Sequence, residues 1–345
     1  MSSARRFIRT IQAQQSKKAL CLAVGSSHTF LSIGDKVVYN QATCLAVHRG
    51  SNEVLAVGDK AYQLLGKTGS HVEVVFPVQN GAISSSKYFR LLLTSIQSEV
   101  GLGAVTMPFL GQQSTLVAVP DTFSPVEQKY FERDITLTQW GKLQYISKSL
   151  AVAKGLDRLT DSNKQLCLII IGGMATEIVV ISGEEVIATQ RFHLGGVHFT
   201  EAVQEIIRAE QQCAVSWHVS EAVKQSIGFI DAATVSRIAR QKKMSVQGKD
   251  ISSQLGKTVV VEAASFLPLF STLVDDLLLN IQSFFAQLPT DLSTGVLSEG
   301  LVLSGGTARM QGVSEYLSEQ LHAEVTSSDS PELDVINGLI KINQK

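Results

Sequence analysis

The sequence predicts an α/β protein built from two duplicated domains with mixed, mainly parallel sheets. The segment Leu166–Ile187 reads LCLIIIGGMATEIVVISGEEVI, in which an apolar run, a glycine pair, a β-branched run and a second glycine turn follow one another. This order is typical of three buried strands joined by tight turns. The segment Leu20–Val38, LCLAVGSSHTFLSIGDKVV, repeats it, and Gly25–Thr29 has the same spacing as Gly172–Thr176. Two copies, in a chain whose strands alternate with helices, indicate a duplicated α/β domain.

The glycine turns between buried strands predict a phosphate site. A turn such as Gly172-Gly173 lets the backbone approach a ligand closely, with free amide groups directed toward it. One turn alone is equally compatible with an ordinary glycine hairpin, and the second copy favours the phosphate interpretation. Gly195-Gly196 and Gly305-Gly306 add two further candidate turns. None of these turns matches a Walker A loop or a dinucleotide fingerprint.

Length and composition place the chain among globular proteins. Its 345 residues suit two domains that can each bury a core. A hydrophobic content of 44%, a charged content of 18% and a net charge of −1 exclude a disordered chain, and they give no electrostatic reason to expect a nucleic-acid partner. The cysteines Cys21, Cys44, Cys167 and Cys213 form no CxxC pair, which favours a reducing, cytoplasmic compartment.

The N-terminal segment 1–18 combines an apolar stripe with basic residues. Phe7, Ile8 and Ile11 fall on one helical face, and Arg5, Arg6 and Arg9 flank it. This pattern predicts a helix that lies on an anionic membrane surface, and a frayed basic terminus is the alternative. One such helix binds weakly, so firm attachment needs many copies in a polymer. We expect no membrane-spanning helix, because the most apolar candidate, 263–288, carries Asp275-Asp276 in its middle.

Local signals predict the remaining elements. Ser124, Pro125 and Glu127 are typical of a helix start with a capping box. The basic run 240–243 is interpreted as a solvated loop. Strands are predicted at Thr43–His48, Glu53–Val57, Val72–Gly81, Thr115–Val119 and Gly300–Ser304, and helices at Gly58–Leu65, Ser84–Gln97, within Leu143–Leu156, and at Phe199–Glu210, Ser220–Ile227, Ala263–Leu288 and Gln311–His322.

Motifs along nearly the whole chain resemble those of the MreB-type bacterial actins, in the superfamily that joins actins, sugar kinases and chaperone ATPases. The resemblance covers about residues 19 to 340, and MamK-like filament proteins are relatives of the same type. Its motifs are AVGDKAYQLLGKT (56–68), VVFPVQNGAI (74–83), VAVPDTFSPVEQK (117–129), IGGMATEIVVIS (171–182), LGGVHFTEAV (194–203), EAVKQSIG (221–228) and GLVLSGGTARMQGVSEYL (300–317).

The resemblance implies an actin-like fold with four subdomains around a central nucleotide cleft. Domain I is expected at 19–148 plus 322–345, with a smaller subdomain at about 37–75. Domain II is expected at 149–321, with a smaller subdomain at about 189–253. The basic segment 1–18 also resembles the membrane-binding terminus of many MreB proteins.

The resemblance also implies the nucleotide-binding residues. The two hairpin turns hold phosphates from opposite sides, Gly195 and Gly196 approach the ribose and phosphates, Glu221 and Lys224 flank the ribose and adenine, and the third turn packs under the adenosine. The implied set is Gly25, Ser26, Ser27, His28, Thr29, Gly172, Gly173, Thr176, Gly195, Gly196, Glu221, Lys224, Gly305, Gly306 and Thr307.

Three departures from the family pattern remove the expected chemistry. Ala23 and Ile170 occupy the positions of the aspartates that hold magnesium, and Ser147 stands where a Glu-Glu-Pro segment begins whose glutamate positions the attacking water. Met174 adds bulk where a third glycine is expected. Phosphoryl transfer needs a metal ion held by oxygen ligands, so the sequence predicts a degenerate pseudo-ATPase with no metal site and no catalytic residue. Lys148 is a candidate for replacing part of the cation's charge, and a side chain directed to solvent is the alternative.

The leading functional hypothesis is therefore an MreB-like filament subunit on the inner face of the cell membrane, in cell shape determination or intracellular positioning. Its cofactor is ATP or ADP without strong magnesium binding, or none. Its partners are other copies of itself, a conventional MreB or membrane morphogenesis proteins, and the anionic membrane surface, with no nucleic acid. The alternatives are a monomeric actin-fold adaptor that docks a membrane protein's cytoplasmic segment, and an active ATP-hydrolysing filament subunit in which other carboxylates substitute.

Overall fold

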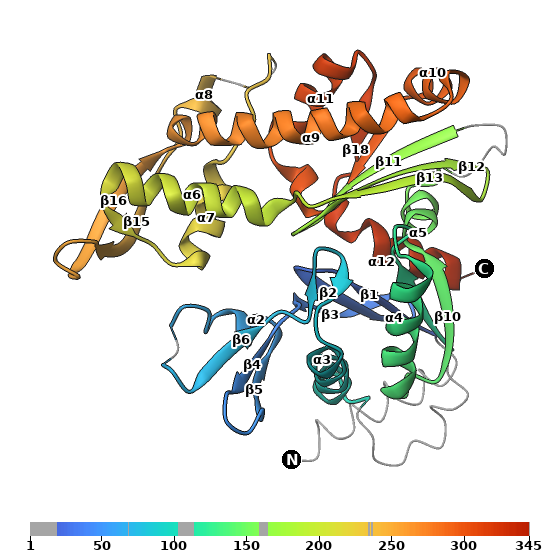
Figure 1. The fold of residues 1–345 in the computed structure, drawn as a ribbon, viewed down its shortest axis with the longest axis horizontal. Coiled ribbons are helices and arrows are strands. Elements are labelled where there is room, and N and C mark those ends of the chain that lie inside the picture. The colour runs from blue at the N-terminus through green and yellow to red at the C-terminus, as the bar shows by residue number, and fades with distance from the viewer. Residues whose placement is uncertain are drawn as a thin grey trace. The chain divides into compact units, whose positions relative to one another are not determined.

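The computed structural model describes residues 19–67, 69–102, 114–158, 165–233, 235 and 237–344 (Figure 1). The predicted membrane helix with Arg5, Arg6, Phe7, Ile8, Arg9 and Ile11 lies outside the described residues. The chain forms two compact units. The first takes Met1–Leu64, Thr68–Leu159 and Leu333–Lys345, and the second takes Leu65–Lys67 and Thr160–Glu332.

The first unit is organised on a five-stranded sheet of order β10-β9-β1-β2-β3. The hairpin strands β1 and β2 pair antiparallel, as do β2 and β3, whereas β9 pairs parallel with both β1 and β10. The sheet is therefore mixed, and its parallel pairings equal the antiparallel ones rather than outnumbering them. The strands are β1 Leu20–Val24, β2 His28–Ile33, β3 Lys36–Ala42, β9 Ser114–Val119 and β10 Lys142–Ser147.

Alternating side chains of β1 enter two different cores of this unit, as the pleat of a strand requires. Leu20 and Leu22 join the apolar cluster that contains residues of α3 (Ser86–Glu99) and α4 (Pro125–Leu137). Cys21 and Ala23 join the cluster with residues of α5 (Lys148–Gly155) and α12 (Asp334–Asn343). The capping box of α4 is confirmed, because the Ser124 amide donates to Glu127 at 2.8 Å and the Glu127 amide donates to the Ser124 hydroxyl at 3.2 Å.

A smaller sheet of the first unit has the order β5-β4-β6 and is accompanied by a short helix and a two-stranded hairpin. These elements are β4 Leu45–His48, β5 Val54–Val57, α2 Gly58–Tyr62, β6 Val72–Val75, β7 Val78–Gln79 and β8 Ala82–Ile83.

The second unit repeats the arrangement in the order β13-β12-β11-β17-β18. Its hairpin strands β11, β12 and β13 pair antiparallel, and β17 pairs parallel with β11 and β18. The duplicated α/β architecture is thus confirmed at the level of strand order and direction. The strands are β11 Gln165–Ile171, β12 Thr176–Ser182, β13 Glu185–Phe192, β17 Leu301–Ser304 and β18 Val325–Ser327.

The unit boundaries differ from the expected domain boundaries at both junctions, for reasons of packing. Helix α5 packs along α12 in the first unit, and a Cβ on Gly338 would lie 1.7 Å from the Ala151 carbonyl oxygen. Strand β18 pairs with β17 in the second unit. The divisions therefore fall after these elements rather than at residues 148 and 322.

Helix α9 (Leu267–Gln287), preceded by the 3-10 turn Ala263–Phe266, is a central core element of the second unit. By length and composition alone, Ala263–Gln287 is a candidate for crossing a membrane, which the sequence had not led us to expect. Its apolar side chains pack with other elements of the unit's core, and the rings of Phe270 and of Phe199 in α6 (Gly196–Gln211) meet edge to face at 5.1 Å. We therefore interpret α9 as a core helix.

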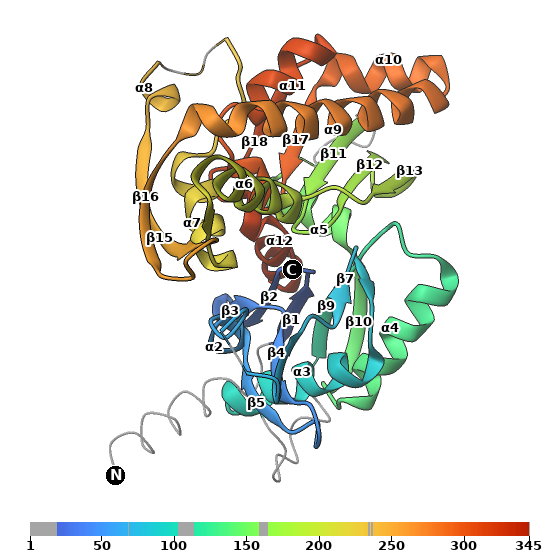
Figure 2. The ribbon, with the colours of Figure 1, turned by 60° about the vertical axis from the view of Figure 1, so that its left-hand side comes forward.

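The rest of the second unit includes a three-stranded sheet of order β14-β15-β16 beside α7 (Figure 2). The basic run 240–243, predicted as a loop, instead joins α8 to β15, where Arg240 pairs with Asp231 at 2.6 Å and Lys243 with Glu262 at 2.5 Å. The elements are β14 Cys213–Ala214, α7 Trp217–Ile227, α8 Arg237–Arg240, β15 Lys243–Asp250, β16 Gly256–Glu262, α10 Thr290–Glu299, the 3-10 turns Gly306–Arg309 and Pro331–Leu333, and α11 Val313–Leu321.

Candidate functional site

The two predicted phosphate turns have the same internal geometry. The Gly25 amide donates to the His28 carbonyl at 2.9 Å, and the Gly172 amide donates to the Ala175 carbonyl at 2.9 Å. Thr29 and Thr176, four residues after the glycines, are both fully buried at the start of the next strand. The equal spacing in the sequence therefore corresponds to a repeated turn.

The first turn is fixed by two neighbouring segments of its own unit. The Ser26 hydroxyl accepts a hydrogen bond from the Gly81 amide at 3.2 Å, and the Ser27 carbonyl accepts one from the Thr43 amide at 2.8 Å. The Thr29 and Thr43 hydroxyls are 2.9 Å apart. The His28 side chain is exposed and its ring stacks on Phe30. Gly25 to Thr29 thus lie together at one end of β1 and β2.

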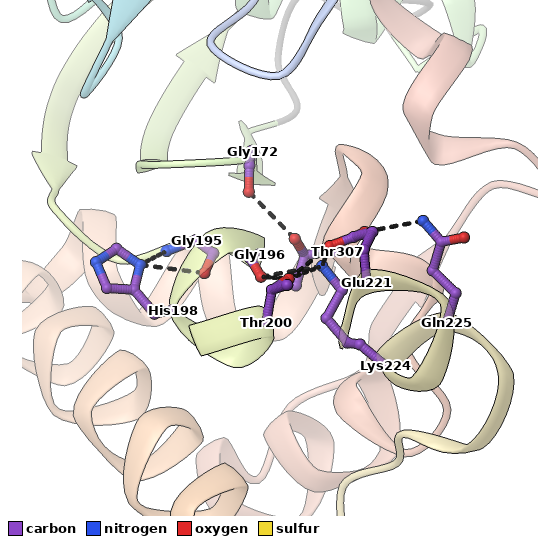
Figure 3. A network of polar contacts seen from close by, with 9 residues as sticks. All are labelled: Gly172, Gly195, Gly196, His198, Thr200, Glu221, Lys224, Gln225 and Thr307. Carbon is purple, nitrogen blue, oxygen red and sulfur yellow. Dashed lines mark hydrogen bonds and ion pairs between the residues drawn. The ribbon is translucent and has the colours of Figure 1, made fainter. Parts of the chain in front are cut away.

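The second turn is held by the start of α6, as Figure 3 shows around Gly172. The Gly196 amide donates to the Gly172 carbonyl at 3.0 Å, and the Val197 amide donates to the Gly173 carbonyl at 2.7 Å. A Cβ on Gly195 would lie 2.7 Å from both of these carbonyl oxygens, so a side chain there would force the two segments apart. The helix start and the turn are therefore one interlocked structure.

The third turn closes on the same place. Gly305 has φ +87° and ψ 157°, a backbone region that is essentially restricted to glycine, and a Cβ there would lie 2.4 Å from the Ile171 carbonyl oxygen. The Thr307 hydroxyl donates to the Gly172 carbonyl at 3.1 Å. The structure thus brings the predicted residues of the second, third and fourth turns together within one unit.

Lys224 and Glu221 form an ion pair of 2.8 Å beside these turns (Figure 3). The Lys224 ammonium also donates to the Gly196 carbonyl at 3.0 Å and to the Thr200 hydroxyl at 2.9 Å. Burial raises the pKa of Glu221, but the Lys224 charge and the hydrogen bonds outweigh it and hold that pKa below its usual value. Burial also lowers the pKa of Lys224, against the opposing effect of Glu221.

Two members of this network were not among the predicted residues. Thr200, whose hydroxyl lies 2.5 Å from Glu221, is one helical turn beyond Gly196, and Gln225, which donates to Glu221 at 2.8 Å, is one turn beyond it. Their i, i+4 spacing in predicted helices was the available signal.

The residues at the family's magnesium positions do not fit a metal ion. Ala23 is 6% exposed and packs in an apolar cluster with Ala118 and Ala151. Ile170 is 2% exposed and lies opposite Glu177 in the β11–β12 pairing. Neither side chain has an oxygen ligand. In the part of the chain that the structure describes, no group of three or more His, Cys, Asp and Glu side chains is arranged to hold a metal.

Ser147 acts as the cap of α5 and contacts a carboxylate that the sequence interpretation missed. Its hydroxyl accepts from the Leu150 amide at 3.1 Å and donates to Asp121 Oδ1 at 2.5 Å, while the Ser149 amide donates to Asp121 Oδ2 at 2.9 Å. Asp121 follows β9 directly after Pro120, and β9 pairs parallel with β10, which ends at Ser147. Lys148 is the half-buried first residue of α5.

Two units with the same mixed sheet and the same glycine turn define a duplicated fold of the actin type. This agrees with the crystal structure of MreB5 of Spiroplasma citri bound to AMPPNP, which matches with a TM-score of 0.82 over 93% of this chain and 94% of that one at 20% identity. The MamK double helical filament matches with a TM-score of 0.74 over 95% and 99% at 19% identity.

Sequence comparison names the family within that class. The family described as MreB/Mbl protein matches residues 17–345. The cell shape-determining protein Mbl of Bacillus subtilis is 24% identical over 89% of this chain and 90% of its own length. The chain belongs to the MreB/Mbl family of bacterial cytoskeletal actins, as its motifs predict.

Proposed function

We propose that this protein is a filament subunit of the MreB type that acts on the cytoplasmic face of the cell membrane and does not hydrolyse ATP efficiently. One observation carries the proposal: the glycine turns keep their geometry, while Ala23 and Ile170 are packed in apolar surroundings where the family's metal carboxylates stand. Such a subunit keeps the architecture for assembly and loses the chemistry that times it.

The physical reason is the charge that phosphoryl transfer develops. A bound metal ion and a positioned water are needed to neutralise that charge and supply the nucleophile. Alanine and isoleucine offer no ligand, and a serine at 147 cannot replace a carboxylate as a base. The polymer is therefore expected to be static or controlled by partners, and cell shape or internal positioning is the role that the family favours.

Nucleotide binding without turnover is supported by the interlocked turns of the second unit, and AMPPNP is the ligand named for the S. citri relative. A thermal-shift titration with ATP, in magnesium and in EDTA, tests this part. A rise in melting temperature supports an occupied cleft, and no shift with any nucleotide leaves only a scaffold role.

Assembly is tested directly on the purified full-length chain by sedimentation and electron microscopy, with and without vesicles of anionic lipid. We expect sedimenting filaments, more of them on vesicles, and phosphate release at the no-protein level. A chain that stays monomeric at high concentration with lipid contradicts the filament proposal. Exchanging Arg5, Arg6 and Arg9 for glutamine should abolish vesicle binding without preventing assembly, because it removes the electrostatic attraction to lipid.

A further inference from the structure

We propose that Asp121 is a relocated carboxylate of the nucleotide site: from the end of β9 it holds the water shell of the divalent cation that accompanies a bound nucleoside triphosphate. The inference rests on the proposed nucleotide binding and deepens it. It concerns only the first unit, and it assigns a positioning role to a residue whose counterpart carboxylates have been lost from β1, β11 and α5.

The first step is the position of Asp121 in the sheet. Strands β1, β9 and β10 run parallel, so their carboxyl ends meet at one edge. That edge carries the Gly25 turn after β1, Asp121 after β9 and Ser147 at the end of β10. In open α/β sheets, ligands bind outside the carboxyl ends of the strands. Asp121 therefore stands next in the sheet to the phosphate-type turn.

The second step is the face of the sheet. Ala23, at the position of a missing metal carboxylate, packs with Ala118 of β9 and Ala151 of α5. Asp121 is bonded to the first turn of that same helix, through Ser147 at 2.5 Å and the Ser149 amide at 2.9 Å. The carboxylate is thus held on the side of the sheet from which the metal carboxylate is absent.

The third step is that a capping role does not use up this carboxylate. Ser147 already caps α5, because its hydroxyl accepts from the Leu150 amide. Each oxygen of Asp121 accepts one of the two hydrogen bonds described and can accept a second. Asp121 is half-buried, so water can reach it. Magnesium dehydrates reluctantly and is often held through its waters by one or two carboxylates, which suits a weak site of this kind.

The test measures binding of AMPPNP to the full-length protein by thermal shift, in magnesium and in EDTA. For the unmodified chain, we expect tighter binding in magnesium than in EDTA. Asp121→Asn should remove that difference by weakening binding in magnesium about tenfold, while binding in EDTA stays unchanged. Asp157→Asn is the matched control: it removes one carboxylate of the same unit that pairs with Lys341 at 2.8 Å, and it should leave both titrations unchanged.

A second variant guards against a folding defect. Asp121→Ser combined with Ser147→Glu returns the carboxylate to α5 and should recover the magnesium-dependent part of the binding. Equal magnesium dependence in the unmodified chain and Asp121→Asn overturns this inference and leaves nucleotide binding intact. The absence of any shift in the unmodified chain contradicts nucleotide binding itself, and this inference with it.

Discussion

The Gly25 turn and the Gly172 turn share one hydrogen-bonded geometry but are embedded differently. The Gly25 turn is attached through the Ser26 hydroxyl and the Thr43 amide, and a Cβ on Gly25 would meet the His28 carbonyl at 3.0 Å. The Gly172 turn has its carbonyls bonded to two amides of α6 and to Thr307. Duplication thus preserved the turn while its surroundings diverged, and we expect the second unit to depend on its turn more strongly than the first.

Each unit contains its own reporter for this comparison. Cys21 in β1 and Cys167 in β11 occupy equivalent strand positions and are fully buried. Burial raises the pKa of both thiols, so neither reacts until its unit opens. The rate at which a thiol reagent labels each cysteine therefore measures the opening free energy of each unit separately.

The largest effect is expected from returning carboxylates to the metal positions. Ile170→Asp should destabilise the second unit by more than about 4 kcal/mol, because it removes a packed side chain and places a charge opposite the buried Glu177. Ala23→Asp should cost at least about 2 kcal/mol less, since no side chain is lost and its partner across the hairpin is Phe30. Labelling of Cys167 and Cys21 measures the two costs, and equal costs would contradict the proposed asymmetry.

Next in size is the effect of a methyl group at the third turn. Gly305→Ala combines a glycine-only conformation with a Cβ 2.4 Å from the Ile171 carbonyl, so a loss of about 3 kcal/mol is expected. Gly25→Ala is the matched control, because that Cβ has a single neighbour at 3.0 Å, and it should cost less than about 1 kcal/mol. Faster labelling of Cys21 than of Cys167 in Gly305→Ala would show that the turn does not stabilise the second unit.

The ion pair of the second unit should come third. Lys224→Met leaves Glu221 partly buried without its cation and should cost about 2 kcal/mol, somewhat less than for a fully buried pair. Because the folded pKa of Glu221 lies below its ordinary 4.5, its stabilising contribution is present above pH 4.5 and is lost as the pH falls through the folded pKa. Urea unfolding of the variant should therefore lose less stability on acidification than the unmodified chain, and parallel pH profiles would contradict this role.

The smallest effect concerns the two buried threonines. Thr176→Val leaves the Leu194 carbonyl without the 2.7 Å bond it accepts, and Thr29→Val leaves the Thr43 hydroxyl without its partner, so each should cost about 1–2 kcal/mol. Replacing Thr29 and Thr43 together by valine should be nearly neutral, because both polar groups are then removed. A double variant as unstable as the single Thr29→Val would point to another role for these hydroxyls.

Patterns that lie within one element or one turn were readable from the sequence. The paired hairpins, the capping box at Ser124 and the glycine turns follow from spacing and local conformation. The basic run at 240–243 was misread because Lys243 finds Glu262 only across the β15–β16 ladder. Asp121 was missed because Ser147 is 26 residues away in the chain and adjacent only through the parallel pairing of β9 and β10.

The sequence by itself determined that this chain has the duplicated actin-type architecture and lacks the metal carboxylates, because turn spacing and residue identity are local properties. Only the tertiary structure decided what replaces them. It packs Ala23 and Ile170 into apolar surroundings, interlocks α6 with the Gly172 turn and places Asp121 on the start of α5. These contacts join residues far apart in the chain, and their geometry depends on how strands and helices pack rather than on any single stretch of sequence.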